Sequence, residues 1–269
     1  MRKYMSAVLA FVVAVGLFGT ASAQSGNARL RVIHASPDAP AVDVYANGNK
    51  VLSNVSFFAA SDYLSVPAGS YKLQVVVAGE TDLTKAVIDA TADLMAGKDY
   101  TVAAANVVAS IEPLVLADNN AAPAAGKAHV RFVHASPDAP AVDIRVKGGP
   151  VLFSNVAFKG TGDYTPVDAG TYDLEVTPAG SDTVVKAIPG VNLEAGTVYT
   201  AWATGLLASL TPEITVDAKA GAAAPAPAPA PAPGNLPVTG AGDSLPFVAI
   251  LALGLFAVAA GTVLRRRSA

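Results

Sequence analysis

The stretch His34–Asp43 reads HASPDAPAVD, and it returns without a substitution at His134–Asp143. Similarity continues on both sides of the two copies, so the chain contains one unit twice. The further matched segments are Arg31–His34 with Arg131–His134, Asp62–Tyr63 with Asp163–Tyr164, Ala68–Val75 with Ala169–Val176, and Ala96–Thr101 with Ala195–Thr200.

Apolar residues within each copy recur with a period of two. In Tyr71–Val75 and again in Tyr172–Val176, tyrosine, leucine and valine alternate with polar or charged residues, which is typical of a strand with one buried face. Turns rich in glycine, proline and asparagine separate such short runs. The pattern predicts an all-β chain with two tandem antiparallel β-sandwich domains, immunoglobulin-like or transthyretin-like, each with about seven strands.

The repeated decapeptide predicts a strand, a rigid corner and a second strand. Leu30, Val32 and His34 share one face of the first strand. Pro37 and Pro40 then hold the backbone out of a helix, and the side-chain oxygens between them can accept nearby backbone N–H groups. We predict a structural corner motif in which each imidazole is half-buried and hydrogen-bonded, made of His34, Asp38, Asp43, His134, Asp138 and Asp143.

Three chemical alternatives exist for this motif and its surroundings. Imidazole and carboxylates suit a divalent cation, so His34, Asp38 and Asp43 form a candidate metal site. Ser36, His34 and Asp43 nominally form a catalytic triad. A lysine–carboxyl amide bond is the third, but Lys72 is matched by an aspartate in the second copy. Because the spacing sets no catalytic geometry and the first copy has no further histidine, we predict no catalytic residue, no metal and no cofactor.

Composition narrows the function classes. The chain has 269 residues, no cysteine, one tryptophan and a formal net charge of -3. Without cysteine, each domain depends on its apolar core and not on disulfides. The predicted exported region has no run of lysine and arginine, so we expect no nucleic-acid partner.

The N-terminus has the layout of a secretory signal peptide. Met1–Lys3 carries two positive charges, an apolar run follows, and Ala21–Ala23 supplies small residues, which predicts a signal peptide at residues 1–23 with cleavage between Ala23 and Gln24. The predicted segments that follow are a first β-sandwich at 24–118, a linker at 119–127, a second β-sandwich at 128–217, and an Ala/Pro-rich spacer at 218–235 whose alternating prolines favour polyproline II.

The C-terminus combines a membrane segment with a processing motif. Residues 245–264 are uncharged and long enough to cross a bilayer as a helix, and residues 265–269 contain three arginines, which predicts a basic cytoplasmic tail. Just upstream lies LPVTG, and this order closely resembles the LPXTG cell-wall sorting signal of Gram-positive-type bacteria. The resemblance implies that a sortase cuts between Thr239 and Gly240 and joins Thr239 to peptidoglycan, after recognising Leu236, Pro237, Val238, Thr239 and Gly240.

The repeated unit also resembles a known family. The stretch HASPDAPAVDVYANG, the Asp-Tyr pair, the strand with Tyr, Leu and Val in alternation, and the last Ala-Gly and Tyr-Thr pairs together resemble the DUF4397 domain over residues 28–118 and 128–217. The resemblance implies a secreted bacterial β module that is frequently found in tandem. It transfers no catalytic residue.

These observations predict a non-enzymatic extracellular protein at the cell wall or cell surface that binds a polysaccharide or a protein. Its other partners would be the sortase, peptidoglycan and, before processing, the membrane around its C-terminal helix. The alternative is a structural spacer retained as a single-pass membrane protein without sortase processing. An exposed aromatic patch repeated on both copies would favour binding.

Overall fold

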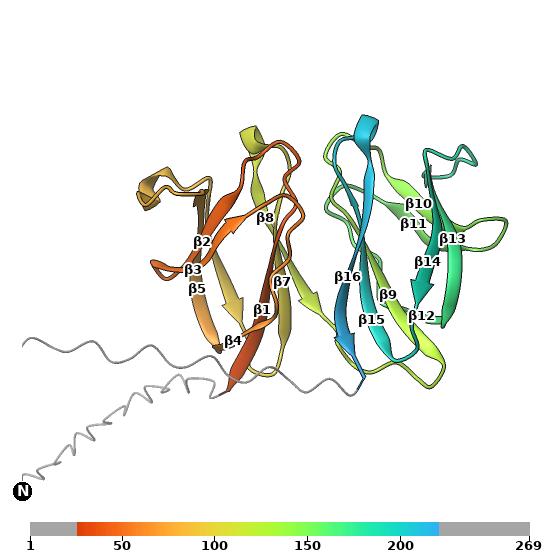
Figure 1. Ribbon diagram of the computed structural model, residues 1–269, viewed down its shortest axis with the longest axis horizontal. Helices are drawn as coiled ribbons and strands as arrows, with labels where there is room; N and C mark the ends of the chain where they lie inside the picture. The colour runs from red at the N-terminus through yellow and green to blue at the C-terminus, as the bar shows by residue number, and fades with distance from the viewer. Residues whose placement is uncertain (1–25, 221–269) are drawn as a thin grey trace, which may run out of the picture. The chain divides into compact units, whose positions relative to one another are not determined.

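The computed structural model describes residues 26–220, and every regular element there except three short 3₁₀ turns is a β-strand. The strands form four sheets of four strands each (Figure 1), so the all-β prediction is confirmed. No helix in this part of the chain is long and apolar enough to cross a membrane. The predicted signal peptide and its cleavage site, most of the spacer, the LPVTG motif, the apolar span and the basic tail lie outside the described residues and stay predictions.

Each repeat has eight strands, where the sequence pattern predicts about seven. A four-residue strand such as β4 is too short to show a clear period of two. The first repeat contains β1 (Asn27–His34), β2 (Val42–Ala46), β3 (Asn49–Val55), β4 (Leu64–Pro67), β5 (Gly69–Val77), η1 (Leu83–Lys85), β6 (Ile88–Leu94), β7 (Asp99–Ala105), η2 (Val108–Ser110) and β8 (Glu112–Asp118). The second contains β9 (Lys127–His134), β10 (Val142–Val146), β11 (Val151–Val156), β12 (Thr165–Asp168), β13 (Gly170–Pro178), β14 (Lys186–Leu193), β15 (Thr197–Thr204), η3 (Leu207–Ser209) and β16 (Thr211–Lys219).

The two repeats share one sheet topology. In the first repeat the sheets have the orders β4-β1-β7-β8 and β3-β2-β5-β6, and the second repeat has β12-β9-β15-β16 and β11-β10-β13-β14. However, β1 pairs in parallel with β7, and β9 pairs in parallel with β15. The prediction of wholly antiparallel sheets is therefore wrong for one pair in each repeat. The chain enters β7 from the opposite sheet, so no hairpin forces it to run against β1.

The sheets of each repeat enclose an apolar core. Leu30 and Val32 point from β1 into this core, as the period of two predicts, and Val75 of β5 packs with Val32 from the opposite sheet. In the second repeat, Phe132 and Val176 occupy the corresponding places in a single apolar cluster. The core is thus built from the inner faces of two sheets, as in a sandwich.

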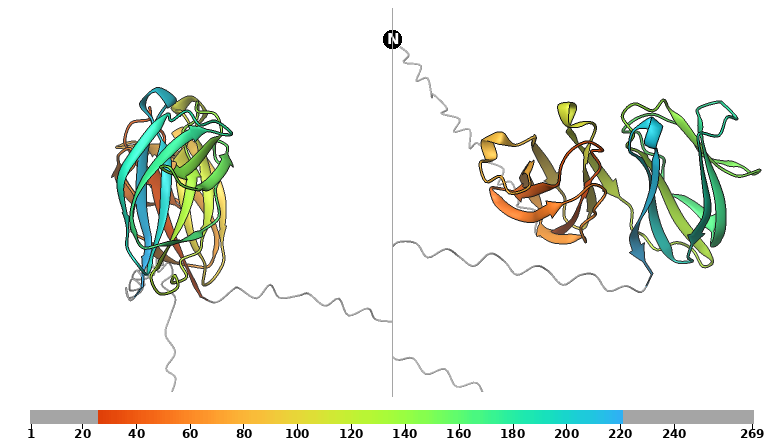
Figure 2. Two further views of the ribbon diagram at one scale, coloured as in Figure 1. Left: turned by 90° about the vertical axis from the view of Figure 1, so that its right-hand side faces the viewer. Right: turned by 45° about the horizontal axis from the view of Figure 1, so that its top comes forward.

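The outer face of β1 is buried as well. Ile33 is fully buried in one apolar cluster with Val133 of β9 and Trp202 of β15. The sheet that contains β1 therefore lies against the sheet that contains β9, and the two repeats share an interface (Figures 1 and 2). A strand that is buried on both faces shows continuous apolar residues, which explains the run Val32–Ile33.

Candidate functional site

The two histidines of the repeated decapeptide hold the corners that follow β1 and β9. The Nδ1 atom of His34 accepts the N–H of Ser36 at 3.3 Å. With Nδ1 as acceptor, the neutral ring carries its proton on Nε2, which donates to the carbonyl oxygen of Pro40 at 3.0 Å. His134 makes the same two bonds, at the same distances, to the equivalent serine and proline. The backbone of the corner thus engages both ring nitrogens in each repeat.

The middle aspartate of each corner joins it to a 3₁₀ turn. Oδ1 of Asp38 accepts the N–H of Val108, the first residue of η2, at 2.7 Å. Oδ1 of Asp138 accepts the N–H of Leu207, the first residue of η3, also at 2.7 Å. Each carboxylate therefore connects the corner to the loop between the last two strands of its repeat.

The third acidic residue of each corner binds two further loops. Asp43 is 2% exposed, and its carboxylate accepts the N–H of Asn54 at 2.8 Å and that of Gly79 at 3.1 Å. Asp143 accepts from the two equivalent residues at 2.6 and 2.9 Å. Asn54 has a φ of 53°, in the left-handed region, so the bond stabilises a backbone conformation that few residues adopt.

Only the first repeat adds a charge to this site. The hydrogen bond from Lys50 Nζ to Asp43, at 2.6 Å, lowers the pKa of Asp43 together with the two backbone N–H groups. The same bond raises the pKa of Lys50. Both groups therefore stay charged, whereas amide formation between them would need a neutral amine and a protonated acid. The contact is an ion pair.

The candidate metal and triad residues do not converge. Ser36 Oγ donates to Asp38 at 3.4 Å and makes no bond to His34 in the described structure. The oxygens of Asp43 are occupied by backbone groups of other loops. Within residues 26–220, no three His, Asp or Glu side chains lie together as ligands for a metal ion. The six residues of the corner motif shape backbone in both repeats.

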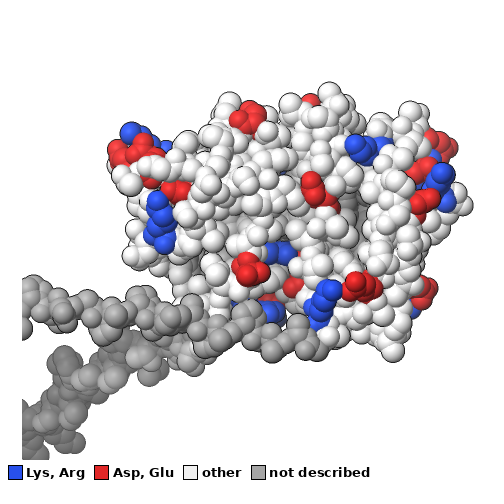
Figure 3. All heavy atoms as spheres, viewed as in Figure 1, with Lys and Arg blue, Asp and Glu red and all other residues white. Residues whose placement is uncertain are grey.

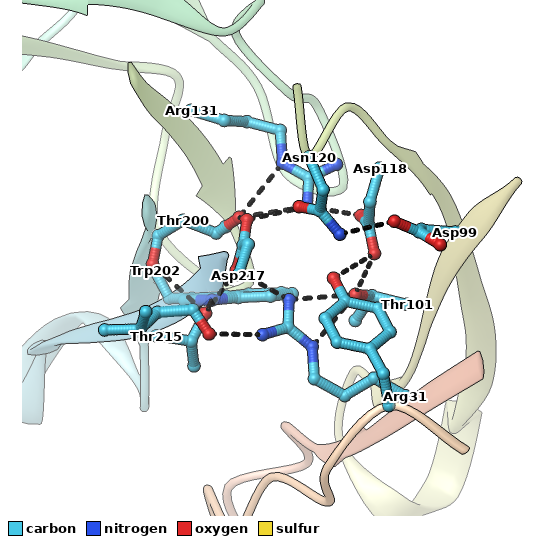
Figure 4. A network of polar contacts seen from close by, with 12 residues as sticks. Arg31, Asp99, Thr101, Asp118, Asn120, Arg131, Thr200, Trp202, Thr215 and Asp217 are labelled. Atoms are coloured by element: carbon cyan, nitrogen blue, oxygen red, sulfur yellow. Dashed lines mark hydrogen bonds and ion pairs between the residues drawn. The ribbon is translucent and has the colours of Figure 1, made fainter. Parts of the chain in front are cut away.

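A second set of duplicated residues lies where the repeats meet (Figure 4). Arg31 of β1 extends into the second repeat, and its Nη2 lies 2.8 Å from Oδ1 of Asp217 in β16. Asp217 also accepts the hydroxyl of Tyr164 at 2.8 Å and the hydroxyl of Thr200. Its own repeat therefore positions the carboxylate that receives the arginine of the other repeat. The side chains of Arg31 and Asp217 are 3% and 0% exposed.

A reciprocal ion pair joins an arginine of the second repeat to an aspartate of the first. Nη2 of Arg131 in β9 lies 2.6 Å from Oδ1 of Asp118 in β8. Asp118 accepts the hydroxyls of Tyr63 at 2.7 Å and Thr101 at 2.6 Å, both from the first repeat. We call the two ion pairs with their supporting residues the inter-repeat clamp, which comprises Arg31, Tyr63, Thr101, Asp118, Arg131, Tyr164, Thr200 and Asp217.

Burial and charge set the ionisation states in the clamp. Burial alone would lower the pKa of Arg31, but the field of Asp217 and other acidic neighbours outweighs it, so the pKa is raised. The pKa values of Tyr63 and Tyr164 are raised, first by burial and then by the adjacent aspartates. Each guanidinium also stacks on the tyrosine ring of its own repeat, at 4.7 Å for Arg31 and 4.6 Å for Arg131. The clamp thus combines charged arginines with neutral tyrosines.

Sequence reasoning matched Arg31 with Arg131 but gave them no role. A signal was present, because each arginine sits inside a strand whose other residues are largely apolar. Arginine is rarely fully buried without a partner. Such a residue, repeated in two copies, indicates a buried acidic partner on another element.

One large side chain fills the interface from one side only. Trp202 is 1% exposed, its indole N–H donates to Thr215 Oγ1 at 3.2 Å, and its ring packs edge-to-face on Phe58 with centroids 6.1 Å apart. In the first repeat Ala103 occupies the equivalent register position, beside Ile33 of β1. Trp202 thus takes the place that a small alanine has in the first repeat.

The corners, the sheet order and the clamp define a class of protein built from paired β repeats. The family model for DUF4397, a domain of unknown function, matches residues 28–145 and 135–227. The chain belongs to the DUF4397 family. The search of curated proteins finds no match.

Solved structures give distant likenesses. The C-terminal domain of AlgF from P. aeruginosa is 21% identical with a TM-score of 0.28, and the match covers 34% of this chain and 98% of that one. The TIE protein of Bacillus anthracis is 11% identical with a TM-score of 0.22, over 66% of this chain and 34% of its own. The CBM26-family module CBMbc of Eubacterium rectale Amy13K, solved with maltoheptaose, is 12% identical with a TM-score of 0.22, over 71% and 95%. At these TM-scores none of them informs the function of this chain.

Proposed function

We propose that the chain is a non-enzymatic cell-surface protein that displays its two DUF4397 repeats as one rigid module for binding or adhesion. A sortase would join it to the cell wall through Thr239, and the Ala/Pro-rich spacer would separate the module from the wall. The observation that carries the proposal is the use of every imidazole and carboxylate of the duplicated corners as a hydrogen-bond partner for backbone groups.

The corner geometry supports a non-enzymatic role. General-base chemistry needs an imidazole nitrogen within reach of a nucleophile or a substrate. In both repeats the two ring nitrogens are already bonded to backbone groups, and His34 and His134 are 1% and 0% exposed. Residues with this burial and these partners suit a structural corner.

Charge distribution and the clamp support a display role. On the face drawn in Figure 3, lysines and arginines lie among acidic residues, and no extended patch of either sign covers that face. The clamp joins the repeats through charges that salt screens little, because they are buried. A module of this kind keeps its shape outside the cell without disulfides.

A structural spacer is the second candidate, and one observation favours it. The duplicated aromatic positions form no repeated exposed patch in the described structure: Phe57 is 39% exposed but its equivalent Phe158 is only partly exposed, and Tyr63 is 9% exposed and bonds to Asp118. Aromatic recognition of a polysaccharide on both repeats is therefore not favoured. Cells that lack the protein would separate the two candidates. Loss of a spacer should change only the structure of the cell surface, whereas loss of an adhesin should abolish attachment to a defined partner.

Mass spectrometry of the wall fraction tests the anchoring. After muralytic digestion, we expect a C-terminal peptide that ends at Thr239 and carries the mass of a wall peptide. A Thr239→Ala variant should accumulate unprocessed in the membrane fraction. Recovery of the parent chain intact to Ala269 from membranes alone would contradict sortase anchoring.

A further inference from the structure

The second repeat contains an open apolar cavity that the first repeat lacks. It lies between its two sheets, has a volume of about 180 Å³, and is lined by residues that include Phe132, Val176, Ala201 and Leu210. The corresponding space in the first repeat, lined by the equivalent Val32 and others, measures about 20 Å³. The two repeats therefore differ in core packing although they share a fold.

Two substitutions remove apolar bulk beside this space, although Phe132 replaces the smaller Val32. Ile88 pairs with Val75 and is 5% exposed, whereas Lys186 takes the same place opposite Val176. A lysine keeps its ammonium in water, so it does not close the core as isoleucine does. Ala201, which lines the cavity, takes the place of Val102. The two are equivalent because Ala201 pairs with Ile214 of β16 and Val102 pairs with Val115, at the matching position of β8.

A bulge in β14 also moves the edge of the sheet. The register of β13 and β14 shifts between Tyr172 and Leu174, whereas β5 and β6 pair without a shift. Gly190 has a φ of 70°, and its N–H donates to Asp173 Oδ1 at 2.9 Å. Asp173 is the residue that replaces Lys72, so this difference between the repeats stabilises the bulge beside the opening.

The cavity is accessible and its wall is apolar. Ile214 of β16 lines it and is 44% exposed. Glu213 is the one charged residue in the lining. It pairs with Trp202, whose side chain points to the interface between the repeats. Because residues that pair directly across strands share a face, the Glu213 side chain starts on the face away from the cavity.

We propose that this cavity binds a small uncharged apolar molecule, or an apolar substituent, with about the volume of one aromatic ring. An engineered apolar cavity of about 150 Å³ in another protein binds benzene, so a cavity of about 180 Å³ has room for a single ring. Binding in a preformed apolar cavity needs no rearrangement of the protein. The inference deepens the proposed binding function, on which it rests, by assigning the ligand class and the repeat.

Methyl NMR of the full-length chain in lipid nanodiscs tests this inference, with benzene as the probe. Isoleucine labelling places reporters in the cavity at Ile144, Ile188 and Ile214, and reference reporters in the first repeat at Ile88 and Ile111. We expect saturable ring-current shifts at the three cavity methyls and none at the references. Lipid absorbs part of the benzene but does not shift individual cavity methyls.

The control variant is Lys186→Ile with Ala201→Val, which introduces the residues that the first repeat tolerates at the same places. It should weaken benzene binding at least about tenfold, because the added side chains occupy the space. A Val151→Ala variant, at a side chain that is 51% exposed on β11, should bind as the parent does. Absence of saturable shifts in the parent, equal shifts in both repeats, or unchanged binding in the filled variant would overturn the inference. None of these results would affect the test of wall anchoring.

Discussion

The two repeats agree in the buried polar pairs that join them and differ in their apolar packing. The clamp and the corners have the same residues in both copies, from Arg31 and Arg131 to Asp118 and Asp217. The inner core has diverged, as Ile88 and Lys186 show. A residue that bonds to the other repeat is constrained by two surfaces, whereas a core residue needs only to fill volume. The comparison indicates that the buried polar pairs are less variable between the repeats than the apolar packing.

The largest expected effect comes from removing either aspartate of the clamp. Asp118→Ala and Asp217→Ala should each lower the free energy of unfolding by about 3–5 kcal/mol, because each removes the carboxylate closest to a buried arginine. Asp217→Ala should cost the more of the two, since Asp217 pairs with Arg31 at 2.8 Å and also lies 3.8 Å from Nη2 of Arg131, whereas Asp118 pairs with Arg131 alone. Urea unfolding measures both.

A surface pair provides the control for the clamp variants. Lys219 and Glu194 form an ion pair whose side chains are 51% and 53% exposed, so Glu194→Gln should leave the unfolding midpoint nearly unchanged. A near-neutral result for one clamp aspartate and a large loss for the other would show that the clamp is not reciprocal.

The next largest effect concerns Trp202, a large side chain that only the second repeat contributes to the interface. Trp202→Ala should cost about 3 kcal/mol, because it removes a fully buried indole and leaves a cavity against Phe58. Trp202→Phe should recover part of the loss, since it restores most of the apolar contact without the bond to Thr215. Thermal unfolding of the three proteins checks the order, and equal stability of Trp202→Ala and the parent would contradict it.

A pH series compares the corners with the rest of the fold. Burial lowers the pKa of His134 below its ordinary value of 6.5. The unfolded chain then binds the proton more readily, so the stability from neutral His134 is complete above pH 6.5 and is lost as the pH falls through 6.5 toward the lower folded value. His134→Gln should therefore show a shallower fall in unfolding free energy between pH 7 and pH 5. Parallel pH curves for the variant and the parent would rule out this contribution.

The smallest expected effect comes from a substitution that makes the core of the second repeat more like that of the first. Lys186→Ile should raise the free energy of unfolding by about 1 kcal/mol, because it adds apolar burial where the first repeat already has isoleucine. The reverse change, Ile88→Lys, should destabilise the first repeat. Differential scanning calorimetry of both variants tests the pair, and a gain in stability from Ile88→Lys would contradict this account of the two cores.

The sequence predicts the all-β class, the duplication and the inner face of β1, because apolar residues alternate and turn residues mark the boundaries. It does not predict the parallel pairing of β1 with β7, since strand order depends on contacts between distant segments. The sequence also gives no sign that the outer face of β1 is buried. Ile33 is buried by the other repeat, and alternation within one strand gives no information about a second domain.

The candidate site is likewise predictable from the sequence only in part. Prolines and the strand pattern predict a corner at His34, but the partners of its ring nitrogens depend on the backbone path through Pro40. The N–H groups that donate to Asp38 and Asp43 lie far along the chain, at Val108 and Gly79, where no local pattern marks them. The ends of the chain are the opposite case, because the sorting motif and the apolar span are predicted from sequence alone and lie outside the described residues.

The reciprocity of the clamp has a consequence for how such chains lengthen. Each repeat contributes one arginine and one aspartate, and each of these forms its closest ion pair with the other repeat. Adding a single further unit to a satisfied pair would place an arginine and a carboxylate in solvent with no counterpart left to meet them. Longer members assembled from this unit should therefore grow two repeats at a time, so that gene duplication acts on the pair.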